Sequence, residues 1–169
     1  MSDVNVTVSG TSISVQVGPQ EYYGSFYSTV DQSNAGATSV NKMTYNTTDL
    51  SNGVSIVSSS RITMANAGIY NIQFSAQFDK TDSGDDKVDI WLSKNGSNVA
   101  NSNTETTLVG NNGKHVAAWN FFVNAAAGDY FELCWHSPDT NVFINYVAAQ
   151  STPTRPAIPS VILTVNKVA

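Results

Sequence analysis

Hydrophobic and polar residues alternate with a period of two along most of the chain, which is the pattern of half-buried β-strands. The clearest example follows Gly68, where five apolar residues from Tyr70 to Phe78 occupy every second position and polar residues lie between them. A helical repeat of three and four residues is not sustained anywhere. The pattern therefore predicts an all-β protein.

Turn residues separate the apolar runs at short intervals. Lys94-Asn95-Gly96, residues 110–113 and Ala127-Gly128-Asp129 combine residue types that favour tight turns. About ten short strands joined in this way are typical of an antiparallel sandwich or barrel. The three prolines between Thr152 and Pro159 instead predict an irregular segment. The predicted strands after the N-terminal region cover residues 22–30, 40–45, 55–57, 61–64, 68–78, 88–92, 104–109, 115–123, 130–136, 142–148 and 161–165.

The N-terminal residues form a pattern of their own. Two alternating apolar runs flank Ser9-Gly10, which predicts an extra β-hairpin over residues 1–18, followed by a main domain over residues 19–169. An isolated hairpin is marginally stable in water, so this one is expected to pack on its own domain or on a neighbouring protein. The residues expected to make that attachment are Val4, Val6, Val8, Ile13 and Val15.

The composition restricts the class of partner. Charged residues make up only 12% of the 169 residues, against about 25% in a typical domain. Eight scattered Lys and Arg residues and a net charge of −5 argue against nucleic-acid binding. No apolar run is long enough to span a bilayer, and the N-terminus lacks the pattern of a secretory signal. A surface rich in Ser, Thr and Asn without such a signal suggests a protein that is made in a host cytoplasm and released by lysis, as virion proteins are.

The sequence offers little catalytic or metal-binding chemistry. The single cysteine, Cys134, is expected to be a small buried hydrophobe, and His115 and His136 have no nearby partner with zinc-ligand spacing. Nucleophile and phosphate-binding motifs are absent, so we expect neither an enzyme nor a cofactor. The acidic segment 79–86 holds the only ligand-like cluster. Its Asp82, Asp85 and Asp86 are weak candidates for a Ca²⁺ site and otherwise belong to a solvated loop.

Three segments resemble the trimeric jelly roll of tumour necrosis factor and the complement globular head. They are the glycine-started strand Gly68–Phe74, the strand and turn Ile90–Gly96, and the turn and strand Ala127–Leu133, in the order that the family has them. The resemblance implies an antiparallel jelly-roll sandwich that assembles as a homotrimer. The C-terminal segment departs from the family pattern, since Ile158-Pro159-Ser160 precedes the final apolar run.

The whole chain also resembles small structural proteins of tailed bacteriophages, especially those of marine and cyanobacterial hosts. Residues Ala65–Phe78, Ala117–Phe122 and Pro159–Val165 carry this resemblance. It implies a homotrimeric virion protein whose partners are its own copies and the major capsid protein or another virion protein. Because the chain has no repeat or coiled-coil shaft, we expect a capsid-decorating trimer on the phage head.

A receptor-binding knob or fibre tip that recognises host surface polysaccharide is the alternative. The polar segments 31–39, 95–107 and 111–114 have the composition of recognition loops, and Tyr22, Tyr23 and Tyr45 are candidates for stacking on sugars. A secreted signalling ligand of the same fold is a third and more remote hypothesis.

Aromatic residues at positions opposite in parity to the core residues need a cover, and a subunit interface would provide one. The expected trimer-interface residues are Trp91, Trp119, Phe121 and Tyr130. Exposure of single aromatic residues, or burial under loops, is the alternative interpretation.

Overall fold

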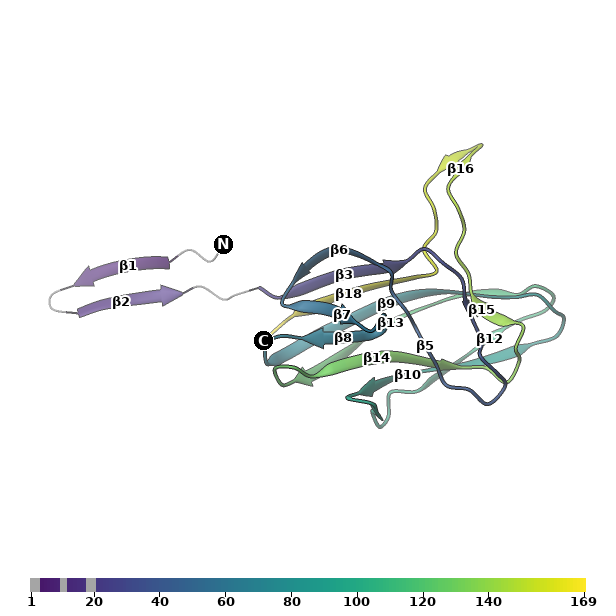
Figure 1. Ribbon diagram of the computed structural model, residues 1–169, viewed down its shortest axis with the longest axis horizontal. Coiled ribbons are helices and arrows are strands. Elements are labelled where there is room, and N and C mark those ends of the chain that lie inside the picture. The colour runs from purple at the N-terminus through teal and green to yellow at the C-terminus, as the bar shows by residue number, and fades with distance from the viewer. Residues whose placement is uncertain (1–3, 10–11, 18–20) are drawn as a thin grey trace.

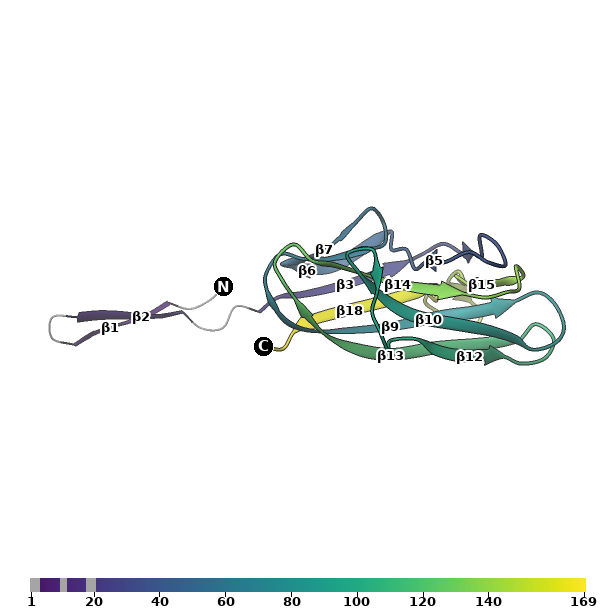
Figure 2. The same cartoon turned by 90° about the horizontal axis from the view of Figure 1, so that it is seen from below.

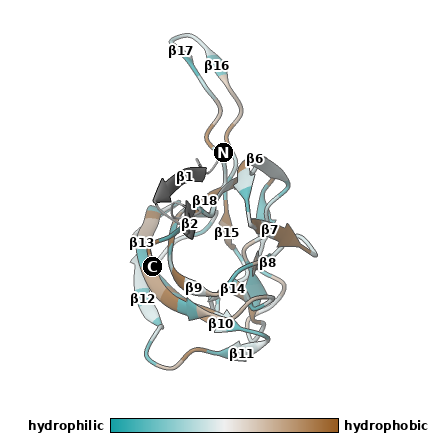
Figure 3. Cartoon of the chain, turned by 90° about the vertical axis from the view of Figure 1, so that its left-hand side faces the viewer, coloured by the Kyte–Doolittle hydropathy of each residue, from teal (hydrophilic) through white to brown (hydrophobic). Residues whose placement is uncertain are grey.

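A computed structural model describes residues 4–9, 12–17 and 21–169, with side chains from residue 21 onward. Two large antiparallel sheets stack face to face (Figures 1 and 2), and seen from one end they surround a common interior (Figure 3). The first, here the β9 sheet, has the order β4 (Gln32–Ser33), β15 (Val142–Ile144), β9 (Gly68–Lys80), β18 (Val161–Lys167), β3 (Tyr23–Ser28) and β6 (Thr47–Asn52), and β13 (Lys114–Ala125) also pairs with β9.

The second sheet, here the β14 sheet, is built from the segments between those strands. Its order is β11 (Ser97–Asn98), β10 (Asp86–Lys94), β14 (Tyr130–His136), β8 (Arg61–Met64) and β7 (Val54–Val57), while β12 (Thr104–Leu108) pairs with β10 and β5 (Asn41–Lys42) with β14. The chain crosses repeatedly from one sheet to the other, as in a jelly roll. The predicted all-β antiparallel sandwich is therefore confirmed. None of the described elements is a helix of the length and apolarity needed to cross a membrane.

The core lies between the sheets and follows the predicted alternation. The apolar face of β9, from Tyr70 to Phe78, is buried along its whole length. It meets the inward residues of β14, and the rings of Phe78 and Trp135 pack edge to face with their centroids 5.4 Å apart. Burying a large apolar side chain in this way stabilises a fold by about 1.5–3 kcal/mol. The alternation of β9 is therefore a principal source of stability.

The predicted N-terminal hairpin is also present. β1 (Val4–Ser9) and β2 (Ser12–Val17) pair in register from Val4 opposite Val17 to Ser9 opposite Ser12. Together they make a two-stranded sheet, and neither pairs with another described strand. The side chains of the expected attachment residues Val4, Val6, Val8, Ile13 and Val15 lie outside the described part of the structure, so their role and the division at residue 18 stay predictions.

β6 and the proline-rich segment are among the regions that differ from the sequence prediction. β6 has an almost wholly exposed, polar sequence, and it forms because β3 offers it an open edge. The proline-rich segment was expected to be irregular, but it carries a small hairpin of β16 (Gln150–Ser151) and β17 (Thr154–Arg155) that projects from the sandwich (Figure 1). Pro153 is compatible with this hairpin because it lies in the turn, where no ladder hydrogen bond is needed.

Two of the predicted turns are joined to each other at one end of the β14 sheet. Asn95 and Gly96 have positive φ angles of 50° and 82°, as a tight hairpin turn requires. The Asn95 side chain donates to Asp129 Oδ1 at 2.7 Å and accepts from the Tyr130 amide at 2.9 Å. Lys94 Nζ lies 2.7 Å from Asp129 Oδ2. The Asp129 carboxylate therefore ties the turn before β14 to the turn after β10.

Asp129 predicts a specific acid sensitivity. Hydrogen bonds from Lys94, from Asn95 and from the Ala126 amide lower the pKa of Asp129 from 3.8 to about 2. Because the folded-state pKa lies below the unfolded-state value, the stabilisation is present above about pH 4 and is lost as the pH falls toward 2. The Asp129→Asn variant is expected to be less stable than the wild type at neutral pH, and its melting temperature should change less with pH across this range. Thermal unfolding at several pH values would measure both effects. An unchanged pH profile would contradict the assignment.

Candidate functional site

Over a continuous area of four strands, the outer face of the β9 sheet carries no charged side chain. The ion pair of Lys114 with Asp79 borders this area at one end, and Asp49 of β6 borders it beside Ser25. The outward residues there are Tyr23, Ser25 and Tyr27 of β3, Ile162, Thr164 and Asn166 of β18, Asn71, Gln73, Ser75 and Gln77 of β9, and Val116, Ala118, Asn120 and Phe122 of β13. Tyr23, Val116, Phe122 and Ile162 are large and exposed, and Phe122 is 66% exposed. We call this area the neutral face.

Side-chain amides connect the strands at one end of the neutral face. Asn71 Oδ1 accepts from Asn120 Nδ2 at 2.9 Å, and Asn71 Nδ2 donates to Asn166 Oδ1 at 3.5 Å. Asn71 is only 8% exposed although it points away from the core, because its neighbours cover it. The neutral face is thus an ordered surface of amides, hydroxyls and apolar groups.

The outer face of the β14 sheet has the opposite character, and ionisable residues lie across most of its strands. This contrast matters because protein interfaces are depleted of charge at their centre, whereas a solvated face tolerates charge well. The neutral face is accordingly the better candidate for contact with another protein. The outward ionisable residues of the β14 sheet are Lys42, Arg61, Lys87, Asp89, Glu105, Glu132 and His136.

Two of the predicted interface residues, Trp119 and Phe121, point inward, so the parity assigned to them from the sequence is corrected. They lie opposite Phe74 and Ile72 of β9, which belong to the core. The Trp119 ring packs edge to face on Phe74 with centroids 4.7 Å apart. Both residues remain half-buried because β13 pairs with no described strand other than β9. The outward aromatic residue of this strand is Phe122.

The other two predicted interface residues, Trp91 and Tyr130, do point outward, but from the β14 sheet. The Arg61 guanidinium lies 4.6 Å from the centre of the Tyr130 ring. Trp91 lies farther along the same outer face, on β10. The four residues therefore do not meet on one surface of a single chain, and their shared role in an interface stays a prediction.

The predicted sugar-stacking tyrosines are also dispersed. Tyr45 is buried in the core, Tyr22 is half-buried beside Lys167, and Tyr23 lies on the neutral face. Part of segment 95–107, which was expected to be a recognition loop, lies beside Trp91, an aromatic residue that the sequence analysis assigned to the interface. Its role in recognition stays a prediction.

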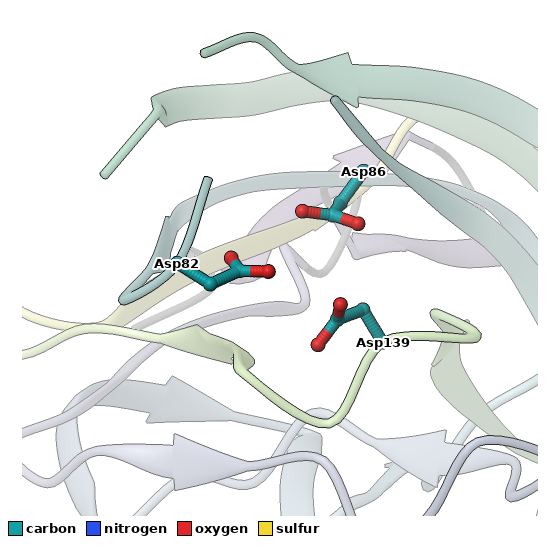
Figure 4. Close-up of side chains that lie close together, drawn as sticks. All are labelled: Asp82, Asp86 and Asp139. Carbon is teal, nitrogen blue, oxygen red and sulfur yellow. The ribbon is translucent and has the colours of Figure 1, made fainter. Parts of the chain in front are cut away.

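The acidic segment forms ion pairs with Lys80, and Figure 4 shows the three aspartates that lie close together there. Carboxylate oxygens of Asp82, Asp86 and Asp139 lie within 4.8 Å of one another, so the structure adds Asp139 to two of the predicted candidates. The Lys80 side chain is 0% exposed, and its ammonium lies 2.6 Å from Asp86 and 3.9 Å from Asp82. It also donates to the Gly84 carbonyl. The Lys80 cation thus offsets part of the negative charge of these three carboxylates.

Asp85, the third predicted candidate, points elsewhere. It accepts a hydrogen bond from the Gly110 amide at 2.9 Å and so joins the acidic loop to the turn between β12 and β13. Asp139 is occupied in part by its own turn, because its Oδ1 accepts from the Asn141 amide at 2.7 Å. These partners hold Asp85 and Asp139, whereas Asp82 Oδ1 is buried and has no hydrogen-bond partner in the described part of the chain.

Cys134 is a buried free thiol, as expected of a small apolar residue. Burial raises the pKa of this thiol, which keeps it in the unreactive protonated form.

Two solved structures with a similar backbone are crystal structures of murine APRIL at pH 8.0 and pH 8.5. Both superpose with a TM-score of 0.56 and cover 88% of this chain and 100% of the other, at 11% and 10% sequence identity respectively. The chain has a tumour necrosis factor-like fold. No protein-family model matches the sequence, and no curated protein matches it. The likeness at this identity establishes the fold, while the resemblance to bacteriophage proteins stays a prediction.

The tumour necrosis factor-like fold accounts for the three segments that carried the resemblance. Gly68 begins β9, Asn95-Gly96 joins β10 to β11, and Ala127-Gly128-Asp129 leads into β14. Each segment marks the start of a central strand or the turn that ends one. The sequence signal therefore came from the positions where the backbone geometry is most restricted.

Lys80 provides a test of the acidic network. Lys80→Met keeps most of the side-chain volume but removes the cation, so the clustered carboxylates repel one another. We expect it to reduce the free energy of unfolding by about 2–3 kcal/mol, less than for a fully buried pair, because Asp82 is 29% exposed. Urea titration would measure the change. Lys87→Met, which removes the exposed partner of Glu105, is the matched control and should change little. Equal stability of the two variants would contradict the network.

Proposed function

We propose that this chain is a non-enzymatic structural subunit that assembles into a homotrimer through its neutral face. The observation that carries the proposal is the segregation of charge. The neutral face has no charged residue and exposes Phe122, Val116 and Ile162, whereas the β14 sheet is covered with ions. An exposed surface of this kind is favoured as an interface because little desolvation of charge accompanies its burial.

Three-fold symmetry adds a reason for neutrality. A residue near a three-fold axis faces two copies of itself, so any charge there meets two like charges. A neutral face of amides, hydroxyls and aromatic rings avoids this repulsion, and amides can pair with their own copies because each has both a donor and an acceptor. The neutral face is therefore the side of the sandwich that we place toward the axis.

A cyclic trimer also needs two different patches on each subunit, since its contacts are heterologous. The free edge of β13 supplies a suitable second patch next to the neutral face. Trp119 and Phe121 are half-buried at this edge, and a neighbouring subunit would complete their burial. In this arrangement these two predicted interface residues contribute from the edge of the sheet, and Phe122 contributes from its face.

We further propose that the trimer is a capsid-decorating protein of a tailed phage, and so belongs to the virion. This rests on the sequence resemblance, on the weakly charged composition and on the hairpin formed by β1 and β2. A trimer suits a three-fold or quasi-three-fold position on a capsid because all three subunits then make equivalent contacts. The hairpin is the element that we assign to attachment.

The oligomeric state is the first test. Gel filtration with light scattering should give a mass near three times the 18.1 kDa of one chain. Phe122→Asp places a charge on the neutral face and should shift the mass toward one chain. Val109→Asp is the matched control, because Val109 is 68% exposed and lies outside the neutral face. A monomeric wild-type chain, or equal behaviour of the two variants, would overturn the assignment.

Capsid binding is the second test. Removal of residues 1–18 should leave the mass of the trimer unchanged but abolish its co-sedimentation with assembled capsids that lack the protein. The full chain is the control and should sediment with them. Binding of the truncated trimer would reject the hairpin as the attachment element, and a full-length trimer that binds no capsid would reject the decorating role.

A further inference from the structure

A hollow lies in the outer face of the β14 sheet. Its volume is about 310 Å³. Trp91 and Asp89 of β10 and His136 of β14 line it from the sheet. The loop that follows β11 lines it from one side, and Val40 lines it from the opposite side. This volume falls at the small end of typical ligand pockets, about 300–1,000 Å³.

The shape of the hollow is fixed by the protein itself. The Trp91 indole Nε1 donates to Asn98 Oδ1 at 2.8 Å, which holds the ring in one orientation. The loop beyond Asn98 is fastened to β10 twice, since the Val99 amide donates to the Leu92 carbonyl at 2.9 Å and the Leu92 amide donates to Ser102 Oγ at 3.1 Å. A ligand would therefore enter a site that needs little ordering, which favours affinity.

Polar groups beside the indole are held in place as well. Asp89 Oδ1 accepts from Asn103 Nδ2 at 3.1 Å, and Asp89 Oδ2 lies 3.7 Å from His136 Nδ1. The other nitrogen of His136 lies 3.0 Å from the Ala37 carbonyl. Asp89 and the amides of Asn98 and Asn103 retain hydrogen-bonding capacity beyond these contacts, because a carboxylate has about four acceptor sites and each amide group donates twice.

We propose that this hollow binds a neutral sugar ring of a glycan. A pyranose has an apolar C–H face that would stack on Trp91, and hydroxyl groups at its rim that would bond to Asp89, Asn98 and Asn103. One flat aromatic group flanked by amides and a single carboxylate matches this combination. The carboxylate disfavours acidic sugars, which would bring a second negative charge next to Asp89. A cage for an organic cation is less well matched, because Trp91 is the one aromatic residue in the lining.

The site is independent of the proposed trimer. Trp91 lies on the β14 sheet, whereas the neutral face lies on the β9 sheet, so assembly through the neutral face leaves the hollow open. A trimer of such subunits would carry three equivalent sugar sites. Even weak single-site binding would then be strengthened when several sites reach the same polysaccharide.

Nuclear magnetic resonance titration of the full chain tests the proposal. The probes are the methyl glycosides of glucose, galactose, mannose and N-acetylglucosamine, with glucuronic acid as the acidic sugar and tetramethylammonium as the cation. At least one neutral glycoside is expected to shift the indole signal of Trp91 and the side-chain amide signals of Asn98 and Asn103 in a saturable way. The indole signal of Trp135, which is fully buried, serves as the internal control.

Variants separate the site from general effects on folding. Trp91→Ala should weaken binding by about tenfold or more through loss of the apolar stacking surface. Trp91→Phe should retain part of the affinity. Asn103→Ala, in an exposed part of the loop, should weaken binding by about twofold to tenfold without loss of structure. Phe122→Asp should bind as the wild type does, so failure of the trimer and failure of the sugar site are distinguishable.

Three results would overturn the proposal. The first is the absence of saturable shifts with every neutral glycoside. The second is tighter binding of glucuronic acid or of tetramethylammonium than of any neutral glycoside. The third is wild-type affinity in a folded Trp91→Ala variant.

Discussion

The alternation of side chains along β9 is the constraint on which the rest of the structure depends. This strand has 13 residues, and β13 pairs with 12 of them in continuous register, while β18 pairs with seven on the other side. Because side chains alternate with a period of two, a slip of one residue would turn the core face of β9 outward. The register that buries Tyr70 to Phe78 is thus the same register that assembles the neutral face from Asn71 to Gln77.

The sequence predicted strand bounds correctly where the residues of a single strand were enough to identify it. The bounds of β8 and β14 agree with the predicted strands 61–64 and 130–136, although the pattern over 61–64 is one of the weaker ones. The sequence did not predict the orientation of side chains where both faces of a strand carry apolar residues. Around Phe121 and Phe122 apolar residues fall at both parities, so only the pairing of Phe121 with Ile72 decides which ring enters the core. β6 was missed because its polar sequence has no alternation, and its pairing with β3 supplies the structure.

The candidate sites were harder to predict than the strands, because they are formed by residues that lie far apart in the sequence. Asp139 lies more than fifty residues after Asp82 and Asp86, and only the approach of the loop before β15 to the acidic loop brings them together. The sugar site has the same origin, since Asp89 and His136 come from strands paired in the β14 sheet and Val40 comes from a segment that crosses beside β14. Trp91 itself was visible as an outward aromatic residue. The sequence did not predict which residues surround Trp91, because their position depends on the hydrogen bond that anchors the following loop at Ser102.

The low proportion of charged residues acquires a different meaning in the folded chain. It does not describe a uniformly neutral surface, because the charges that exist are sorted. Some charged side chains form ion pairs that hold loops and turns, such as the pairs of Lys80 with Asp86 and of Lys94 with Asp129. Much of the remainder lies on the outer face of the β14 sheet and leaves the neutral face without any. A chain with the usual charge content would have to place charged residues within the neutral face as well, whereas the charged residues Asp79 and Lys114 of the β9 sheet lie at its margin. The sparse charge is therefore what allows one sheet to be suited to contact with protein while the other stays solvated and open to a small polar ligand.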